Sequence, residues 1–210
     1  MDIVVIGGAG FIGCNVSDYY LRNHHHVTVF DNCSRKGTAD QYMIDYSRIY
    51  GLRTIVFRQS CIYGYRQFGV EDQGWVTHFT ISSMFDRALT IYGDGKQVRD
   101  VLFIDDLVQA YDMAIKNINV TAGKAYNIGG GPNKKLSLLN LIGYLEKFFG
   151  KKLTYTFSNW RPGDQRVFIC DIRKAKNEFG WEPTIGVEEG VRLLAAWVKD
   201  NREEFKSIYF

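Results

Sequence analysis

The N-terminal segment contains glycines with the spacing of a dinucleotide-binding loop, Gly7, Gly10 and Gly13. A β-branched run at residues 2–6 precedes the loop, and a second apolar run at residues 27–30 ends at Asp31. Such glycines let the backbone turn tightly and approach a pyrophosphate at the N-terminus of the next helix. A carboxylate about 20 residues after the loop can bind the adenosine ribose and would repel a 2′-phosphate. The pattern therefore predicts an NAD site; the alternative is a glycine turn that only connects a strand to a helix.

The composition limits the kinds of partner that we expect. A chain of 210 residues with 46% apolar residues can bury a core and form one or two domains. The net charge is +3 without a block of like charges, so neither nucleic acid nor an anionic membrane is expected. No signal peptide or membrane-spanning apolar run is visible, which predicts a cytoplasmic location. The cysteines lack metal-type spacing, and the histidines at 24–26 are expected to form an exposed connection, so no metal site is predicted.

The elements that would position these residues alternate between strands and helices, which predicts an α/β fold. Strands are expected at residues 54–57, 89–92 and 125–128. Helices are expected at residues 38–50 and 75–87, after the caps Asp105 and Ser137, and from Val187 onward. The helix at 38–50 has apolar residues at helical spacing, namely Tyr42, Met43, Tyr46 and Ile49. Its tyrosines Tyr42, Tyr46 and Tyr50 are expected to pack the helix.

The glycine turn resembles the nucleotide-binding turn of the extended short-chain dehydrogenase/reductases, a family of NAD-dependent nucleotide-sugar epimerases and dehydratases. The resemblance implies a Rossmann-like doubly wound parallel sheet with a small C-terminal substrate-binding α/β part. It also implies a set of residues that contact the cofactor: Gly7, Gly10, Phe11, Ile12, Gly13, Asp31, Asn32, Ser34 and Arg35.

The sheet implied by this resemblance is incomplete. A dinucleotide-binding sheet usually has about six parallel strands, and each strand–helix unit takes about 30 residues. Residues 31–37 resemble the segment after the second strand of CDP-paratose 2-epimerases, whereas residues 37–43 resemble a helix far downstream. We therefore expect an internal deletion on the order of 100 residues. Its junction would lie near residues 34–39, where the shared Lys-Gly dipeptide joins the two segments.

This junction defines the expected domains. Residues 1–64 would form the incomplete NAD-binding Rossmann part, and residues 65–210 the substrate-binding part interleaved with the remaining Rossmann elements. Removal of the middle strands would leave the first strand with an unpaired edge. The chain is therefore expected to be a deletion product, a gene-model fragment, or a protein that completes its sheet with another copy.

The deletion also affects the expected catalytic residues. In the family, a tyrosine four residues before a lysine is the acid/base, and an upstream Ser or Thr orients it. If Lys36 is this catalytic lysine, Asn32 occupies the tyrosine position. An asparagine has no proton to exchange near neutral pH, so no turnover is expected. The alternative is that Lys36 is a solvated residue beside the adenine end of the cofactor.

The substrate half retains more of the family's motifs. Segments 66–68 and 72–76 resemble CDP-sugar 2-epimerases more than UDP-glucose 4-epimerases, and segments 92–101 and 161–164 match patterns of the wider family. The resemblance implies that Asp164 holds its loop in place and that the substrate is bound by Arg66, Gln73, Arg99 and Arg161. A guanidinium offers phosphate oxygens a planar, always-charged fork. The alternative for each arginine is a surface ion pair.

The resemblance implies an NAD-dependent nucleotide-sugar epimerase, an isomerase most like the CDP-paratose 2-epimerases. Its NAD would transiently oxidise a sugar carbon and stay bound. The expected partner is a CDP-sugar. Further copies of the chain are partners in the alternative in which another copy completes the sheet. Two alternatives remain: a catalytically inactive NAD- or nucleotide-binding remnant, and another nucleotide-sugar epimerase or dehydratase.

Overall fold

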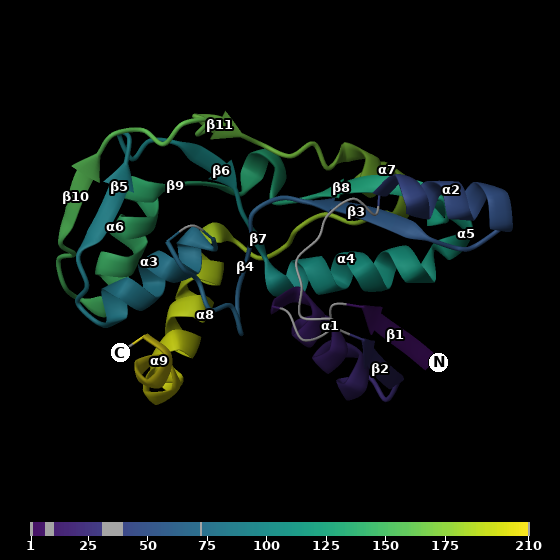
Figure 1. Ribbon diagram of the computed structural model, residues 1–210, viewed down its shortest axis with the longest axis horizontal. Helices are drawn as coiled ribbons and strands as arrows, with labels where there is room; N and C mark the ends of the chain where they lie inside the picture. The colour runs from purple at the N-terminus through teal and green to yellow at the C-terminus, as the bar shows by residue number, and fades with distance from the viewer. Residues whose placement is uncertain (1, 7–10, 31–39, 72, 210) are drawn as a thin grey trace. The chain divides into compact units, whose positions relative to one another are not determined.

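The computed structural model describes residues 2–6, 11–30, 40–71 and 73–209 (Figure 1). The chain divides into two compact units. Unit 1 comprises residues 1–59, 104–128 and 171–183, and unit 2 comprises residues 60–103, 129–170 and 184–210. The two units are therefore interleaved along the sequence. The assignment of cofactor and substrate binding to particular parts of the chain stays a prediction.

The N-terminal part of unit 1 is a β–α–β unit. Strand β1 (Asp2–Ile6), helix α1 (Phe11–Arg22) and strand β2 (His26–Phe30) follow one another. The two strands are parallel, in a register that runs from Asp2 opposite His26 to Ile6 opposite Phe30. This is the strand–helix–strand order predicted from the apolar runs on either side of the glycine loop.

A second pair of parallel strands completes the strands described in unit 1. Strand β3 (Ile55–Gln59) pairs with β8 (Lys124–Ile128) over the full length of both. Within the described residues, β1 and β2 form one two-stranded sheet, and β3 and β8 form another. A complete dinucleotide-binding sheet is continuous, so the prediction of an incomplete Rossmann-like sheet is confirmed.

The helices of unit 1 are α1, α2 (Asp40–Tyr50), α4 (Ile104–Lys116), α5 (Ile118–Thr121) and α7 (Arg173–Phe179). Helix α4 contacts α1 and has buried residues on one face, among them Leu107, Ala110 and Ala114. The fully buried Trp181 donates a hydrogen bond from Nε1 to the carbonyl of Asp106 at 3.0 Å. Helix α4 begins at Ile104, so Asp105 lies in its first turn and is not its N-cap. A carboxylate there still interacts favourably with the helix dipole.

The expected packing of Tyr46 and Tyr50 in α2 is wrong, because their side chains are 48% and 67% exposed. Met43 and Ile49 are 41% and 61% exposed; the side chain of Tyr42 lies outside the described part of the chain. Helical spacing identifies the apolar face of a helix but not whether another element covers it. In a chain that lacks several strand–helix units, a face of this kind can lose its cover.

The described residues of unit 2 form three small sheets and four helices. Strand β4 (Ile62–Tyr63) is parallel to β7 (Leu102–Phe103), and β5 (Leu89–Tyr92) is parallel to β10 (Tyr155–Ser158). The third sheet has the order β11 (Val167–Phe168), β6 (Val98–Asp100), β9 (Lys135–Ser137), and a 3₁₀ turn at Gly131–Asn133 precedes β9.

The helices of unit 2 pack together around an apolar core. They are α3 (Trp75–Met84), α6 (Leu138–Phe149), α8 (Val187–Asp200) and α9 (Arg202–Tyr209). Helices α3, α6 and α8 contact one another pairwise and bury residues such as Ile81, Leu145 and Leu194. The Ser137 side chain accepts a hydrogen bond from the amide of Asn140 at 3.2 Å, which confirms the predicted N-cap of α6. No helix in the described residues is long and apolar enough to cross a membrane.

Candidate functional site

The predicted cofactor residues are described only in part. Helix α1 begins at Phe11, so Phe11, Ile12 and Gly13 form its first turn, with Gly13 buried. A helix N-terminus that follows a parallel strand is the arrangement that a pyrophosphate requires. The remaining predicted cofactor and catalytic residues lie outside the described residues: Gly7, Gly10, Asp31, Asn32, Ser34, Arg35 and Lys36.

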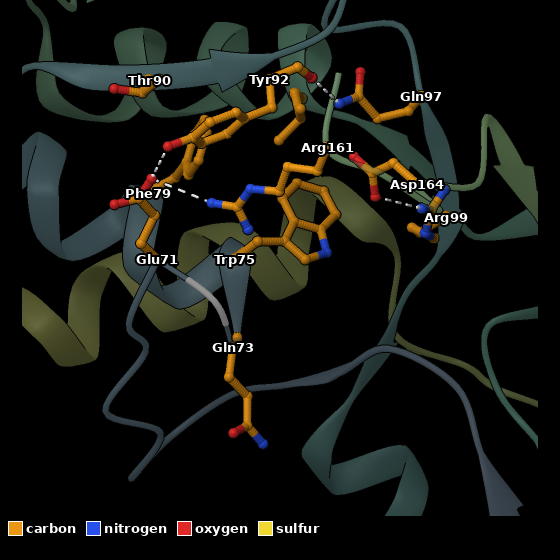
Figure 2. Close-up of a pocket in the computed structure, with 12 residues that line it drawn as sticks. Glu71, Gln73, Trp75, Phe79, Thr90, Tyr92, Gln97, Arg99, Arg161 and Asp164 are labelled. Carbon is orange, nitrogen blue, oxygen red and sulfur yellow. Dashed lines mark hydrogen bonds and ion pairs between the residues drawn. The ribbon is translucent and has the colours of Figure 1, made fainter. Parts of the chain in front are cut away.

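Unit 2 contains a pocket of about 190 Å³ (Figure 2). Its lining includes three of the predicted substrate residues, Gln73, Arg99 and Arg161. The other lining residues are Glu71, Gly74, Trp75, Phe79, Thr90, Tyr92, Gln97, Leu138 and Asp164. The fourth predicted residue, Arg66, does not line this pocket and has a left-handed backbone conformation with φ of 63°. The structure thus brings together residues from three segments that are far apart in the sequence.

The guanidinium of Arg161 lies over an aromatic ring in this pocket. Its guanidinium carbon is 4.0 Å from the centroid of the Tyr92 ring, and its Nη2 is 3.2 Å from Oε1 of Glu71 (Figure 2). The Tyr92 hydroxyl donates a hydrogen bond to the same Glu71 oxygen at 2.6 Å. The guanidinium therefore has a cation–π contact on its face and a charge-assisted hydrogen bond at its edge.

A tight turn positions Glu71. The amide of Val70 donates to the carbonyl of Gln73 at 2.9 Å, and the amide of Gln73 donates back to the carbonyl of Val70 at 3.0 Å. Gly69 packs closely against the start of α3, since a Cβ atom at Gly69 would lie 2.5 Å from the amide nitrogen of His78. The residue that precedes α3, Gly74, has a φ of 77°, a conformation that favours glycine. These backbone constraints fix the turn that carries Glu71.

The hydrogen bond from Tyr92 lowers the pKa of Glu71, and the positive charge of Arg161 acts in the same direction. Glu71 is therefore ionised at neutral pH. An ionised carboxylate is only an acceptor of hydrogen bonds, with about four lone-pair sites on its two oxygens.

Arg99 forms the other positively charged part of the pocket. It donates from Nη1 to the carbonyl of Gln165 at 2.6 Å, and its Nη2 is 3.7 Å from Oδ1 of Asp164 (Figure 2). Asp164 and Gln165 belong to the loop between β10 and β11, so Arg99 ties this loop to β6. The predicted function of Asp164, which was to hold its loop in place, agrees with this contact.

Asp100, the neighbour of Arg99 on β6, faces the interior and is fully buried. It accepts hydrogen bonds from the Ser60 hydroxyl at 2.8 Å and from the amide of Gly131 at 3.1 Å. A Cβ atom at Gly129 would lie 2.5 Å from Oδ2 of Asp100, so only glycine leaves room for the carboxylate. Asp100 therefore joins β6 to two loops, which is a structural role.

Trp75 supplies an aromatic wall and contacts Cys61. Its indole Nε1 donates a hydrogen bond to Sγ of Cys61 at 3.1 Å. Burial raises the pKa of the Cys61 thiol to about 11, so the sulfur stays protonated at neutral pH. A buried thiol of this kind is not an activated nucleophile.

A family model described as GDP-mannose 4,6 dehydratase matches residues 33–194. The chain belongs to this family. The match confirms the resemblance to NAD-dependent nucleotide-sugar epimerases and dehydratases, and the family's Rossmann-like fold agrees with the parallel strands of unit 1.

Curated relatives in this family are similar over most of the chain. CDP-paratose 2-epimerase of Salmonella typhi is 45% identical over 79% of this chain and 50% of that protein. UDP-glucuronate 4-epimerase of Thermodesulfobacterium geofontis is 34% identical over 83% of this chain and 52% of that protein. The chain thus spans about half the length of the curated relatives that it matches.

Solved structures with the family's fold are also similar. UDP-glucose 4-epimerase from Thermotoga maritima, solved with UDP-glucose, has a TM-score of 0.85 at 21% identity. The match covers 96% of the present chain and 100% of the epimerase chain. dTDP-glucose 4,6-dehydratase from Bacillus anthracis, solved with NAD, has a TM-score of 0.82 at 20% identity and covers 99% of each chain. At this identity, the likeness establishes the fold.

The lining residues that were not predicted as site residues from the sequence include Glu71, Trp75 and Tyr92. Trp75 and Tyr92 lie inside motifs that carry the family resemblance. The motifs were recognised from the sequence, but the contribution of these two residues to the pocket was not predicted. Glu71 lies in a turn between two such motifs, and only the folded turn brings its carboxylate to Arg161.

Proposed function

We propose that this chain derives from an NAD-dependent nucleotide-sugar epimerase acting on a CDP-sugar, and that unit 2 retains the site for the nucleoside diphosphate. The observation that carries the proposal is the meeting of Gln73, Arg99 and Arg161 around one pocket. Two guanidinium groups suit the oxygens of a diphosphate, and three aromatic rings in the same pocket suit a planar base. The similarity to CDP-paratose 2-epimerase supports the choice of a CDP-sugar.

The proposed cofactor is NAD. When bound, NAD would accept a hydride from a sugar carbon and return it to the opposite face. Phe11, Ile12 and Gly13 would place the start of α1 against the pyrophosphate, and Asp31 would accept hydrogen bonds from the adenosine ribose. The parallel pairing of β1 and β2 around α1 fits this arrangement.

We further propose that this chain binds its nucleotide ligands but does not catalyse epimerisation. Asn32 stands four residues before Lys36, where an acid/base tyrosine would be needed, and it cannot exchange a proton near neutral pH. A second candidate function is therefore a nucleotide-binding module that is not catalytic. The separate two-stranded sheets of unit 1 favour this second function, because they leave the dinucleotide-binding sheet incomplete. A second copy of the chain could complete that sheet.

Two measurements test these proposals. Purified protein is incubated with CDP-paratose and NAD while formation of the 2-epimer is followed, and binding of CDP is measured by titration calorimetry. We expect CDP binding without product. Arg99→Ala should weaken CDP binding about tenfold or more, because a hydrogen bond to a charged group is lost. Product formation would show that another group replaces the tyrosine, and failure to bind CDP would contradict the proposed site in unit 2.

A further inference from the structure

The contacts of Arg161 show what kind of group the aromatic part of the pocket accepts. The guanidinium is planar, lies 4.0 Å from the centroid of the Tyr92 ring and donates an N–H bond to Glu71 at 3.2 Å. The Tyr92 hydroxyl donates to the same carboxylate from within the plane of its own ring. The guanidinium and the tyrosine ring thus lie over one another, and each donates a hydrogen bond to Oε1 of Glu71. The site suits a flat group with an N–H donor at its edge.

A pyrimidine with an exocyclic amine has both of these features. Stacked on Tyr92, its ring would take the place of the guanidinium, and its amine would lie over the tyrosine hydroxyl, where Glu71 can accept its hydrogen. We propose that Glu71 selects the base of the nucleotide and favours an aminopyrimidine, cytosine, over a pyrimidine with an oxo group at the same position. This inference rests on the proposed nucleotide-binding function of unit 2.

The charge of Glu71 explains the direction of this selectivity. Its carboxylate is ionised because the hydrogen bond from Tyr92 and the charge of Arg161 lower its pKa. An ionised carboxylate cannot donate a hydrogen bond, so it would attract an amine and repel the oxygen of uracil. Uracil has an oxo group in place of this amine, so the hydrogen bond from the amine to Glu71 would be lost and the oxygen would face a negative charge.

The size of the pocket indicates what happens to Arg161 when a nucleotide enters. The pocket measures about 190 Å³, whereas sites for ligands of this size measure about 300–1,000 Å³. Arg161 occupies the face of Tyr92 that the base would need. Movement of Arg161 away from Glu71 would open this face and release its guanidinium to the diphosphate. The same arginine thus covers the base site before binding and contacts phosphate afterwards.

Binding of CDP and UDP to the wild type and to Glu71→Gln tests the inference. We expect the wild type to bind CDP about tenfold or more tightly than UDP, since a hydrogen bond to a charged group is worth at least this factor. Glu71→Gln should weaken CDP binding and strengthen UDP binding, because an amide can also donate to an oxo group. The ratio of the two affinities should fall to within about threefold of unity.

Glu188→Gln is the matched control. Glu188 also lies in unit 2, is similarly exposed and pairs with one cation, Lys147, at 2.6 Å. This variant should keep the wild-type preference for CDP, and thermal melting of each variant verifies that it folds.

Three outcomes would overturn the inference. Equal affinity of the wild type for CDP and UDP would show that the base is not selected. An equal loss of both affinities in Glu71→Gln would show that Glu71 binds the ribose, which both nucleotides share. In either case the proposed diphosphate site would stand. If the wild type bound neither nucleotide, the proposed function of unit 2 would fail as well.

Discussion

The two units differ in how completely they retain the parts that their proposed ligands need. In unit 2, arginines from separate motifs meet at one pocket, and a buried carboxylate at Asp100 holds the surrounding loops. In unit 1, the described strands form two separate pairs, and Met43, Tyr46 and Ile49 of α2 are exposed. A small pocket needs only a few loops to be held in place, whereas a parallel sheet needs every strand to pair. Loss of central strands therefore damages a dinucleotide-binding sheet more than a nucleotide pocket.

The largest expected effect concerns the stability of unit 2. Asp100→Ala should lower the free energy of unfolding by about 2–6 kcal/mol, because it leaves two buried donors, Ser60 and Gly131, without their acceptor. Urea denaturation followed by circular dichroism measures the change. Asp200→Ala removes an exposed carboxylate at the end of α8 in unit 2, and its effect should stay within about 0.5 kcal/mol. Similar effects of the two substitutions would show that Asp100 does not hold the loops together.

The second effect compares the two units directly. The described strands β1 and β2 pair only with each other and are packed against helix α1, whereas larger sheets gain stability from further strand pairs. Amides of β1 and β2 should therefore exchange with solvent about 100-fold faster, relative to their intrinsic rates, than the central amides of α6 and α8. Hydrogen exchange followed by NMR measures both sets in one sample. Comparable protection would contradict the view that unit 1 is the weaker unit; if protection increased with protein concentration, a second copy would complete the sheet.

The sequence reveals long elements better than the positions of individual site residues. The periodic apolar residues of α6 and its cap Ser137 were predicted correctly, because a helix and its cap depend on neighbouring residues. The two-residue strands β4, β7 and β11 carry no periodic pattern, so they could not be predicted. Helix α9 follows α8 with a single residue between them and was missed, although Phe205 is fully buried.

The candidate site shows the same limit. The family's motifs predicted that Arg99 and Arg161 bind the substrate, since a motif preserves residue type and order. The proposed function of Glu71 depends on contacts with Tyr92 and Arg161, which are separated from it by 21 and 90 residues. Contacts of this range arise only when the chain folds, and the sequence of the turn around Glu71 does not encode them by itself.

A third prediction distinguishes charge from geometry in unit 2. Arg161→Lys keeps the positive charge but removes the planar fork that would bind two phosphate oxygens at once. We expect CDP to bind about five- to tenfold more weakly than to the wild type, as measured by titration calorimetry. Arg192→Lys is the control, because Arg192 is an exposed residue of α8 that does not line the pocket. An unchanged affinity in Arg161→Lys would mean that charge alone suffices at this position.

The smallest expected effect concerns the Tyr92 hydroxyl. Tyr92→Phe keeps the aromatic ring but removes the hydrogen bond that contributes most to the lowered pKa of Glu71. The carboxylate binds an amine only when it is ionised, so affinity for CDP is present above its pKa and is lost as the pH falls through it. Since the wild-type pKa is lowered, wild-type affinity should persist to more acidic pH than that of Tyr92→Phe. At neutral pH Glu71 is ionised in both proteins, and their affinities for CDP should differ by no more than about threefold.

Calorimetric titrations with CDP between neutral and acidic pH measure both effects. UDP serves as the control, because its oxo group gains nothing from an ionised Glu71. Superimposable CDP profiles would show that the tyrosine hydroxyl does not control the charge of Glu71. Unit 2 would then bind the base through the aromatic ring of Tyr92 alone.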